Sequence, residues 1–252
     1  MSYDRKFFEV RQRSARESAE RITEWLVKLL SPRSVLDVGC GTGSWLASFG
    51  SRGVFDLLGL DGDWVPKDRM EIPLEQFRVV DLRKPFKLDR RFDLAICLEV
   101  AEHLPADAGD ALVTSLIAAA PVILFSGAIP HQGGTGHVNE QWQGYWIERF
   151  ERLDMVCVDC FRPHFWTDTS AAWWYSQNAF FAATKGTEHL DTLRAEEQRA
   201  SMGKCDVVHP RMLEMRLREA GDPNNYSVRR FAKVLPGLLW RSIMRRVSRR
   251  PS

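Results

Sequence analysis

The chain has 252 residues, of which 44% are apolar and 27% charged, so its composition is that of a globular protein and excludes wholesale disorder. No apolar run approaches the roughly 20 residues that cross a bilayer, and the start MSYDRKFFEV lacks the apolar centre of a secretion signal. The formal net charge of +2 is the sum of +8 from residue 229 onward and −6 elsewhere. These features predict a cytoplasmic protein with one α/β domain and appended segments.

The first expected element is a helix over residues 14–30, because Ala15, Ala19, Ile22 and Leu26 recur at helical spacing before Ser-Pro ends the pattern. Apolar strand candidates then alternate with helical stretches, and two more strand candidates, DMVCVDCF and NAFFAATK, follow. This alternation predicts an α/β fold with a seven-stranded, mostly parallel sheet and helices on both faces. Ligands of such sheets bind beyond the carboxyl ends of the strands.

The segment VLDVGCGTGSW places Gly39, Gly41 and Gly43 at alternate positions directly behind the first expected strand. A glycine-rich turn between a strand and a helix lets a ligand contact backbone amides, because a Cβ atom would occupy the contact volume. A dinucleotide site needs the spacing G-x-G-x-x-G, and the position of its last glycine is Ser44 here. The spacing is therefore wrong for a dinucleotide pyrophosphate.

These residues resemble the first motif of the class I S-adenosylmethionine-dependent methyltransferases, an acid followed by G-x-G-x-G, with Asp37 as the acid. Gly59-Leu60-Asp61 is similar to the end of the family's second strand, and the resemblance implies that Asp61 binds the ribose hydroxyls. Asp81-Leu82 resembles the family's adenine-edge position, and FDLAICLEVAEHL resembles its fourth-strand motif. The resemblance covers roughly residues 34–185 and implies a Rossmann-like sheet.

The resemblance also implies the cofactor, S-adenosylmethionine, and a methyltransferase domain over residues 1–185. Trp64 could cover the adenine ring or only fill its loop, and Asp37 and Asp61 could instead be acids that fix their own turns. The expected cofactor-binding residues are Asp37, Gly39, Cys40, Gly41, Gly43, Asp61, Gly62, Trp64, Asp81, Leu82 and Leu98.

The stretch EVAEH holds the candidate catalytic groups. A helix that begins near Glu99 would place Glu99, Glu102 and His103 on one face at the carboxyl edge of the sheet, and His137 would come from a loop over that edge. The pattern resembles metal-assisted O-methyltransferases of ubiquinone biosynthesis and of small-RNA 3′ ends. Three roles stay open: the four residues hold a divalent cation such as Mg²⁺, His103 or His137 acts directly as the base, or all are structural.

The acceptor side is expected to come from the loop 130–137, which carries His131, and from an aromatic insertion over residues 164–178. Aromatic rings beside hydrogen-bonding side chains suit a sugar ring or an aromatic acceptor, whereas a packed lid without substrate contact is the alternative. The expected substrate contacts are His131, Trp166, Trp173, Trp174 and Tyr175, with Asp168, Gln177 and Asn178 as polar neighbours.

Residues 186–252 are expected to form a charged helical appendage that ends in a basic amphipathic tail. Over residues 239–250, apolar side chains gather on one helical face and arginines on the other, which suits peripheral contact with the inner membrane face. A solvated tail and a helix packed on its own domain are the alternatives. Nucleic acid is disfavoured as a partner because the rest of the chain is acidic.

The function expected from these features is methyl transfer from S-adenosylmethionine to a hydroxyl of a small-molecule, sugar or lipid-linked acceptor, by in-line displacement. One rival is a metal-dependent RNA 2′-O-methyltransferase, which would need a basic surface on the catalytic body. Another is a cofactor-binding adaptor without catalytic turnover.

Overall fold

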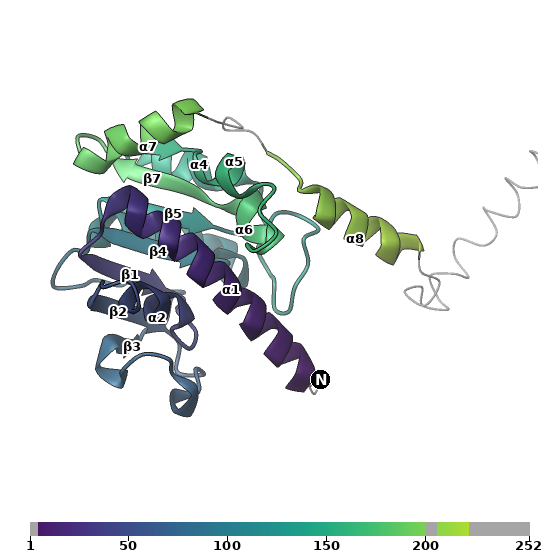
Figure 1. The fold of residues 1–252 in the computed structure, drawn as a ribbon, viewed down its shortest axis with the longest axis horizontal. Helices are drawn as coiled ribbons and strands as arrows, with labels where there is room; N and C mark the ends of the chain where they lie inside the picture. Colours follow the sequence, from purple (N-terminus) through teal and green to yellow (C-terminus); the bar gives the residue numbers. More distant parts are fainter. Residues whose placement is uncertain (1–4, 200–205, 222–252) are drawn as a thin grey trace, which may run out of the picture. The chain divides into compact units, whose positions relative to one another are not determined.

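A computed structural model describes residues 5–199 and 206–221, and the chain forms two compact units, Met1–His209 and Pro210–Ser252. The first unit is built on a single seven-stranded sheet in the order β3-β2-β1-β4-β5-β7-β6 (Figure 1). β7 runs antiparallel to both of its neighbours, and the other strands run parallel to one another. The expected fold class is confirmed. The strands are β1 (Ser34–Val38), β2 (Asp56–Asp61), β3 (Phe77–Val79), β4 (Leu94–Leu98), β5 (Val122–Ser126), β6 (Met155–Val158) and β7 (Phe180–Thr184).

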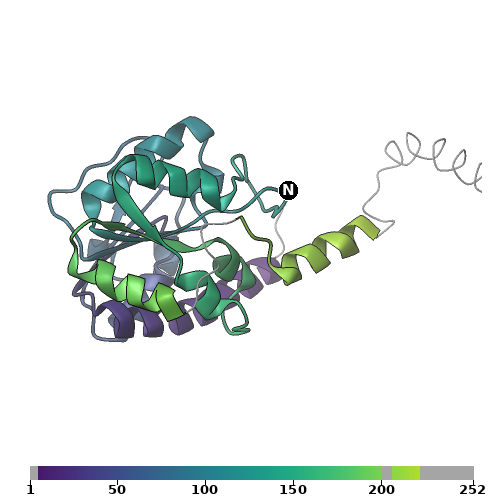
Figure 2. The ribbon, with the colours of Figure 1, turned by 90° about the horizontal axis from the view of Figure 1, so that it is seen from above.

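Helices cover both faces of this sheet (Figures 1 and 2). One face carries α1 (Arg5–Leu30), α2 (Ser44–Gly50), α5 (Phe161–Phe165), α6 (Trp173–Asn178) and α7 (Glu188–Arg199). The other face carries α3 (Gly109–Ala119) and α4 (Gln143–Arg152). Short 3₁₀ turns span Lys67–Arg69, Leu74–Gln76, Ala101–His103 and Ala106–Ala108, and α8 (Pro210–Gly221) lies in the second unit.

The central strand β4 is apolar at every position, and both of its faces are buried. In β4, Leu94 and Ile96 pack with the α1 side of the sheet, whereas Ala95 and Cys97 pack with the α3 side. Removal of a side chain of the size of leucine or isoleucine from water contributes about 1.5–3 kcal/mol. The continuous apolar runs therefore specify a sheet that needs helices on both sides.

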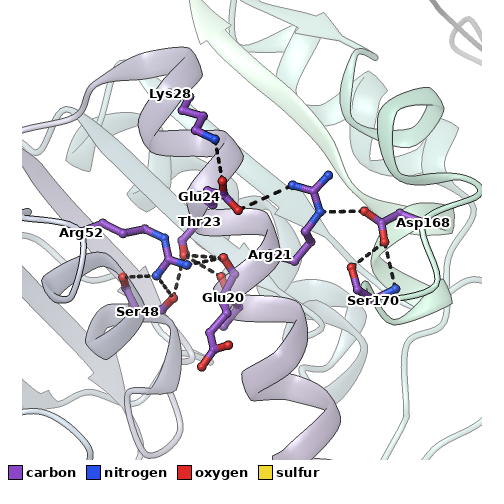
Figure 3. Close-up of polar contacts among 10 residues, drawn as sticks. Glu20, Arg21, Thr23, Glu24, Lys28, Ser48, Arg52, Asp168 and Ser170 are labelled. Carbon is purple, nitrogen blue, oxygen red and sulfur yellow. Dashed lines mark hydrogen bonds and ion pairs between the residues drawn. The ribbon is translucent and has the colours of Figure 1, made fainter.

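α1 is longer than the helix expected over residues 14–30, because it begins at Arg5. The added stretch, RKFFEVRQR, is rich in good helix formers but lacks the regular apolar spacing on which the expectation rested. α1 packs along α2 and is joined to it by polar contacts (Figure 3). Thr23 Oγ1 lies 2.7 Å from Ser48 Oγ, and Arg52 donates to the same Ser48 hydroxyl at 2.9 Å.

α1 also holds the aromatic insertion that follows β6. Arg21 Nε donates to Asp168 Oδ2 at 2.8 Å, and the Ser18 hydroxyl accepts the backbone N–H of Ala172 at 2.9 Å (Figure 3 shows the first contact). The ring of Trp25 packs edge-on to Phe161 and Phe165 of α5. One helix therefore positions both α2, which follows the glycine-rich turn, and the expected acceptor side.

α7 belongs to the first unit, since Leu190 and Leu193 are buried in the core on the α1 side. The functional division expected at residue 186 stays a prediction. Among the described residues, none of the helices combines the length and the apolar character needed to cross a membrane.

Candidate active site

The glycine-rich turn joins β1 to α2, and its three glycines adopt left-handed backbone conformations, with φ values of 85° at Gly39, 53° at Gly41 and 87° at Gly43. A Cβ atom at Gly39 would lie 2.2 Å from Val100 Cγ2, and one at Gly43 would lie 2.7 Å from Ile72 Cγ1. Beside Gly41, apart from its chain neighbours, no atom of the described residues lies within 4 Å of the position that a Cβ would take. Two glycines are therefore required by packing of the protein on itself, and Gly41 alone borders open space.

Asp61 ends β2 and fixes this turn. Its Oδ2 accepts the Gly41 N–H at 2.7 Å, and its Oδ1 accepts the Gly62 N–H at 2.7 Å. An ionised carboxylate has about four lone-pair sites, so two remain for ligand hydroxyls. Burial raises the pKa of Asp61, and the two amide hydrogen bonds oppose that shift.

Asp37 lies in β1 behind the turn and is 3% exposed. Its Oδ2 is buried and has no hydrogen-bond partner in the part of the chain that the structure describes. Burial, and then the nearby charge of Asp61, hold the pKa of Asp37 well above its usual range. The electrostatics of the turn therefore favour a neutral Asp37 beside a hydrogen-bonded Asp61.

The other expected cofactor residues lie around the same strand ends. The Trp64 ring is 69% exposed, and a Cβ at Gly62 would lie 2.1 Å from it, so the ring lies directly over that glycine. Asp81 pairs with Arg83, which lowers the pKa of Asp81. Leu82 and Cys40 are buried, Leu98 is partly buried against the core, and burial raises the pKa of the Cys40 thiol.

The expectation of a helix from Glu99 is wrong. Glu99 has a left-handed backbone, with φ 56°, and only a 3₁₀ turn follows it, over Ala101–His103. Its N–H donates to Ser126 O at 3.2 Å and to Ser126 Oγ at 3.0 Å, which extends the contact between β4 and β5 by one residue before the chain turns. The sharp turn after β4 therefore replaces the first turn of the expected helix.

The Glu99 carboxylate is engaged by amide side chains. Its Oε2 accepts Gln132 Nε2 at 2.8 Å, and its Oε1 accepts Asn178 Nδ2 at 2.9 Å. The same Gln132 presents its Oε1 to the amides of Gln177 and Asn178, at 3.0 and 2.9 Å. This buried network anchors Glu99 to the loop after β5 and to the end of α6.

Glu102, His103 and His137 do come together. Each offers a ligand atom within 4.8 Å of those of the other two, and Glu99 is not part of this group. The two imidazole rings meet edge to face with their centroids 4.9 Å apart. Glu102 is 1% exposed and neither of its carboxyl oxygens has a hydrogen-bond partner among the described residues. Burial, and then the charge of Glu99, raise the pKa of Glu102. Three of the four expected metal ligands thus form one cluster.

Glu140, which the sequence analysis did not select, shapes the loop that brings His137 to this cluster. Its Oε1 lies 2.9 Å from His137 Nδ1 and accepts the Gly133 N–H at 2.6 Å, and its Oε2 accepts the His131 N–H at 2.8 Å. The Val138 N–H donates to Glu102 O at 2.8 Å. His131 itself is exposed, with φ 69°. The sequence does show an acid three residues after His137, and this spacing could have indicated that Glu140 binds the histidine.

The aromatic insertion is divided between core and site. Tyr175 is 6% exposed and meets Trp45 edge to face at 5.3 Å, and Trp174 is partly buried against the same core. Trp166 and Trp173 both lie near His209, with ring centroids 4.6 and 6.4 Å from it. His209 was missed because it follows the insertion by more than 30 residues in the sequence.

The polar residues expected to face the acceptor make hydrogen bonds within the protein. Asp168 accepts Arg21, Asn178 binds Glu99, and Gln177 Oε1 accepts the His209 N–H at 2.8 Å. Their side chains therefore fix the wall of the site. Sequence alone could not separate this structural use from direct contact with an acceptor.

The strand order, the antiparallel β7 and the glycine-rich turn after β1 define the fold class of the Rossmann-like methyltransferases. The sequence matches the methyltransferase-domain family over residues 8–156, and the chain belongs to that family. The expected enzyme class is confirmed. No curated protein matches the sequence.

Solved structures of similar fold include magnesium protoporphyrin IX methyltransferase (ChlM) from Synechocystis PCC 6803 with bound S-adenosylhomocysteine, at TM-score 0.52 and 17% identity over 73% of this chain and 90% of that one. The same enzyme with bound S-adenosylmethionine has a TM-score of 0.50 and 17% identity over 73% and 86%. DesVI from Streptomyces venezuelae has a TM-score of 0.51 and 16% identity over 73% and 100%. At these sequence identities, the similarity shows a shared fold.

Proposed function

We propose that this chain transfers a methyl group from S-adenosylmethionine to a hydroxyl of a small-molecule, sugar or lipid-linked acceptor. The observation that carries the proposal is the pairing of Gly41, which borders open space, with Asp61, which keeps free lone pairs beside it. The fold shared with a methyltransferase that binds S-adenosylmethionine supports the choice of cofactor.

When bound, the cofactor supplies an electrophilic methyl group on a sulfonium. Asp61 would accept the ribose hydroxyls, and the open side of Gly41 would let the ligand approach the main chain. Displacement in line requires an oriented acceptor, which can account for roughly 7–11 kcal/mol of the barrier in favourable cases. The rigid wall formed by Glu99 and its amide partners would provide this orientation.

The cluster of Glu102, His103 and His137 fits a divalent cation, because the buried Glu102 oxygens have no hydrogen-bond partner among the described residues and lie beside two imidazoles; Mg²⁺ is the ion expected from the sequence. A bound cation would polarise the acceptor oxygen. Alternatively, His103 or His137 would accept the hydroxyl proton directly. The cation would use all three residues, whereas direct proton transfer would use one histidine and no metal, so a chelator distinguishes the two roles.

We expect EDTA to abolish methyl transfer and Mg²⁺ to restore it if the cluster holds a cation, with Glu102→Gln reducing activity at least tenfold. Glu148→Gln is the matched control, since Glu148 is an exposed glutamate of α4 that lies outside the cluster. Activity that is unaffected by EDTA in the wild type would rule out the cation and leave direct proton transfer to a histidine or a structural role of the cluster.

The cofactor is tested by isothermal titration of the purified chain with S-adenosylhomocysteine. The acceptor is tested by transfer of a labelled methyl group to cell extracts fractionated into lipid, glycan, RNA and small-molecule pools. No heat and no thermal shift with S-adenosylhomocysteine would overturn the proposal. Binding without transfer to any pool would favour the adaptor, and label in the RNA pool would favour the RNA 2′-O-methyltransferase.

Peripheral contact with the inner membrane face is proposed for the basic tail, which lies outside the described residues. Its support is the run of eight basic residues without an acid from residue 229 onward. Each basic residue near an anionic surface contributes about 1 kcal/mol to binding. A cytoplasmic location is part of the same proposal.

A further inference from the structure

The segment 62–72, between β2 and β3, lies against the glycine-rich turn. The Glu71 N–H donates to Thr42 O at 2.8 Å, and the Thr42 hydroxyl donates to Glu71 Oε1 at 3.1 Å. The next residue, Ile72, fills the space beside Gly43. Backbone and side chain of one glutamate therefore both bind the same residue of the turn.

The second oxygen of Glu71 reaches the N-terminal helix. Arg16 Nε of α1 donates to Glu71 Oε2 at 2.9 Å, and the side chains of Arg16 and Glu71 are 57% and 19% exposed. An ion pair as exposed as this contributes little by itself. Its effect is to orient the carboxylate whose other oxygen binds Thr42.

The turn needs such an external contact because of its composition. The three glycines adopt left-handed conformations in the structure. Glycine has access to many other backbone conformations, so holding the turn in this one costs conformational entropy. Thr42 lies between Gly41 and Gly43, and its side chain binds Glu71. A turn that is ordered before the ligand arrives has a smaller entropic cost of binding.

We propose that Glu71 is a positioning residue of the cofactor site: through Thr42 it holds the glycine-rich turn in the conformation that directs the Gly41 N–H to Asp61. The inference rests on the proposed binding of S-adenosylmethionine at this turn. Glu71 acts through Thr42 and Gly41, and its loss should lower affinity for the cofactor more than it lowers stability.

The test compares variants of the full chain by titration with S-adenosylhomocysteine, by thermal unfolding and by hydrogen exchange of peptides that cover residues 39–46. We expect Thr42→Val and Glu71→Ala each to raise the dissociation constant about three- to tenfold, the effect of one typical hydrogen bond within a protein. Both should speed exchange in residues 39–46. Thr42→Ser keeps the hydroxyl and should therefore bind S-adenosylhomocysteine with wild-type affinity.

Glu75→Ala, an exposed glutamate in the following 3₁₀ turn, is the matched control and should bind as the wild type does. Wild-type affinity in both Thr42→Val and Glu71→Ala would overturn the inference while the proposed function stands. A similar loss in Glu75→Ala would also overturn it, because the effect would then be one of general charge. Absence of binding in the wild type would overturn the proposed function and the inference together.

Discussion

Asp61 performs two tasks with one carboxylate, because it anchors the Gly41 and Gly62 amides and would accept ribose hydroxyls. We expect Asp61→Ala to weaken binding of S-adenosylhomocysteine more than tenfold, since hydrogen bonds to a charged group are worth about 1.5–3 kcal/mol each. Titration calorimetry measures the change. Asp63→Ala removes an exposed acid two residues later and should have little effect. Equal affinity in the two variants would remove Asp61 from the site.

Asp37 makes stability depend on pH, because burial raises its pKa in the folded state. The native chain then binds more protons than the unfolded chain above pH of about 4, so stability falls as pH rises, by about 1.4 kcal/mol per unit up to the folded pKa. Asp37→Asn should remove this slope.

In thermal unfolding, Asp37→Asn should therefore be more stable than the wild type at pH 7, and the difference should vanish below pH 4. The unpartnered Oδ2 means that the amide loses no hydrogen bond at that atom. A variant that is less stable than the wild type at every pH would show that the charged form of Asp37 is favoured in the fold.

At the scale of elements, the glycines of the β1–α2 turn have different roles: Gly39 is required by packing, and Gly41 is expected to contact the ligand. Gly39→Ala would place a Cβ 2.2 Å from Val100, so we expect a loss of about 2–5 kcal/mol in stability from overpacking and the left-handed backbone. Gly41→Ala meets no protein atom and should cost about 1–2 kcal/mol. Its binding of S-adenosylhomocysteine should nevertheless fall at least tenfold, because the Cβ occupies the ligand side of the turn.

Urea unfolding and calorimetry measure the two effects separately. Normal affinity in Gly41→Ala would mean that the ligand does not approach the main chain at this position. A Gly39→Ala variant as stable as the wild type would mean that Val100 can move away, and that the packing explanation for Gly39 fails.

The turn after β4 shows the limit of sequence patterns at this scale. The i, i+3, i+4 spacing of Glu99, Glu102 and His103 is compatible with a helix, and it correctly grouped Glu102 with His103. A positive φ at a non-glycine residue leaves no signal in the sequence. Contact with Ser126 of the neighbouring strand and with two amide side chains determines it, and these lie 27 to 79 residues away.

At the scale of the whole chain, the two units make different contributions. Removal of residues 236–252 eliminates five arginines, and we expect it to abolish pelleting with vesicles that contain anionic lipid. Binding of S-adenosylhomocysteine should not change, since the candidate site lies within Met1–His209. Vesicles of neutral lipid are the control. Equal pelleting of the truncated and complete chains would dismiss membrane contact through the tail.

The sequence by itself predicted the sheet class from local order along the chain, and its resemblance to the class I methyltransferases predicted the cofactor motif. Apolar runs specify buried parallel strands, and three alternate glycines behind a strand specify a turn with left-handed backbone conformations. Asp61 was within reach of the same logic, since it ends the next strand at the same edge.

Only the tertiary structure decided which residues act together. Val100 and Ile72 explain two of the three glycines, and Glu140 folds the loop that carries His137. Glu99 binds Gln132 and Asn178 and does not join the cluster of Glu102, His103 and His137. The physical reason is that buried polar groups form hydrogen bonds with residues that are close in space. These residues can be far apart in the sequence, so the sequence pattern does not show which ones pair.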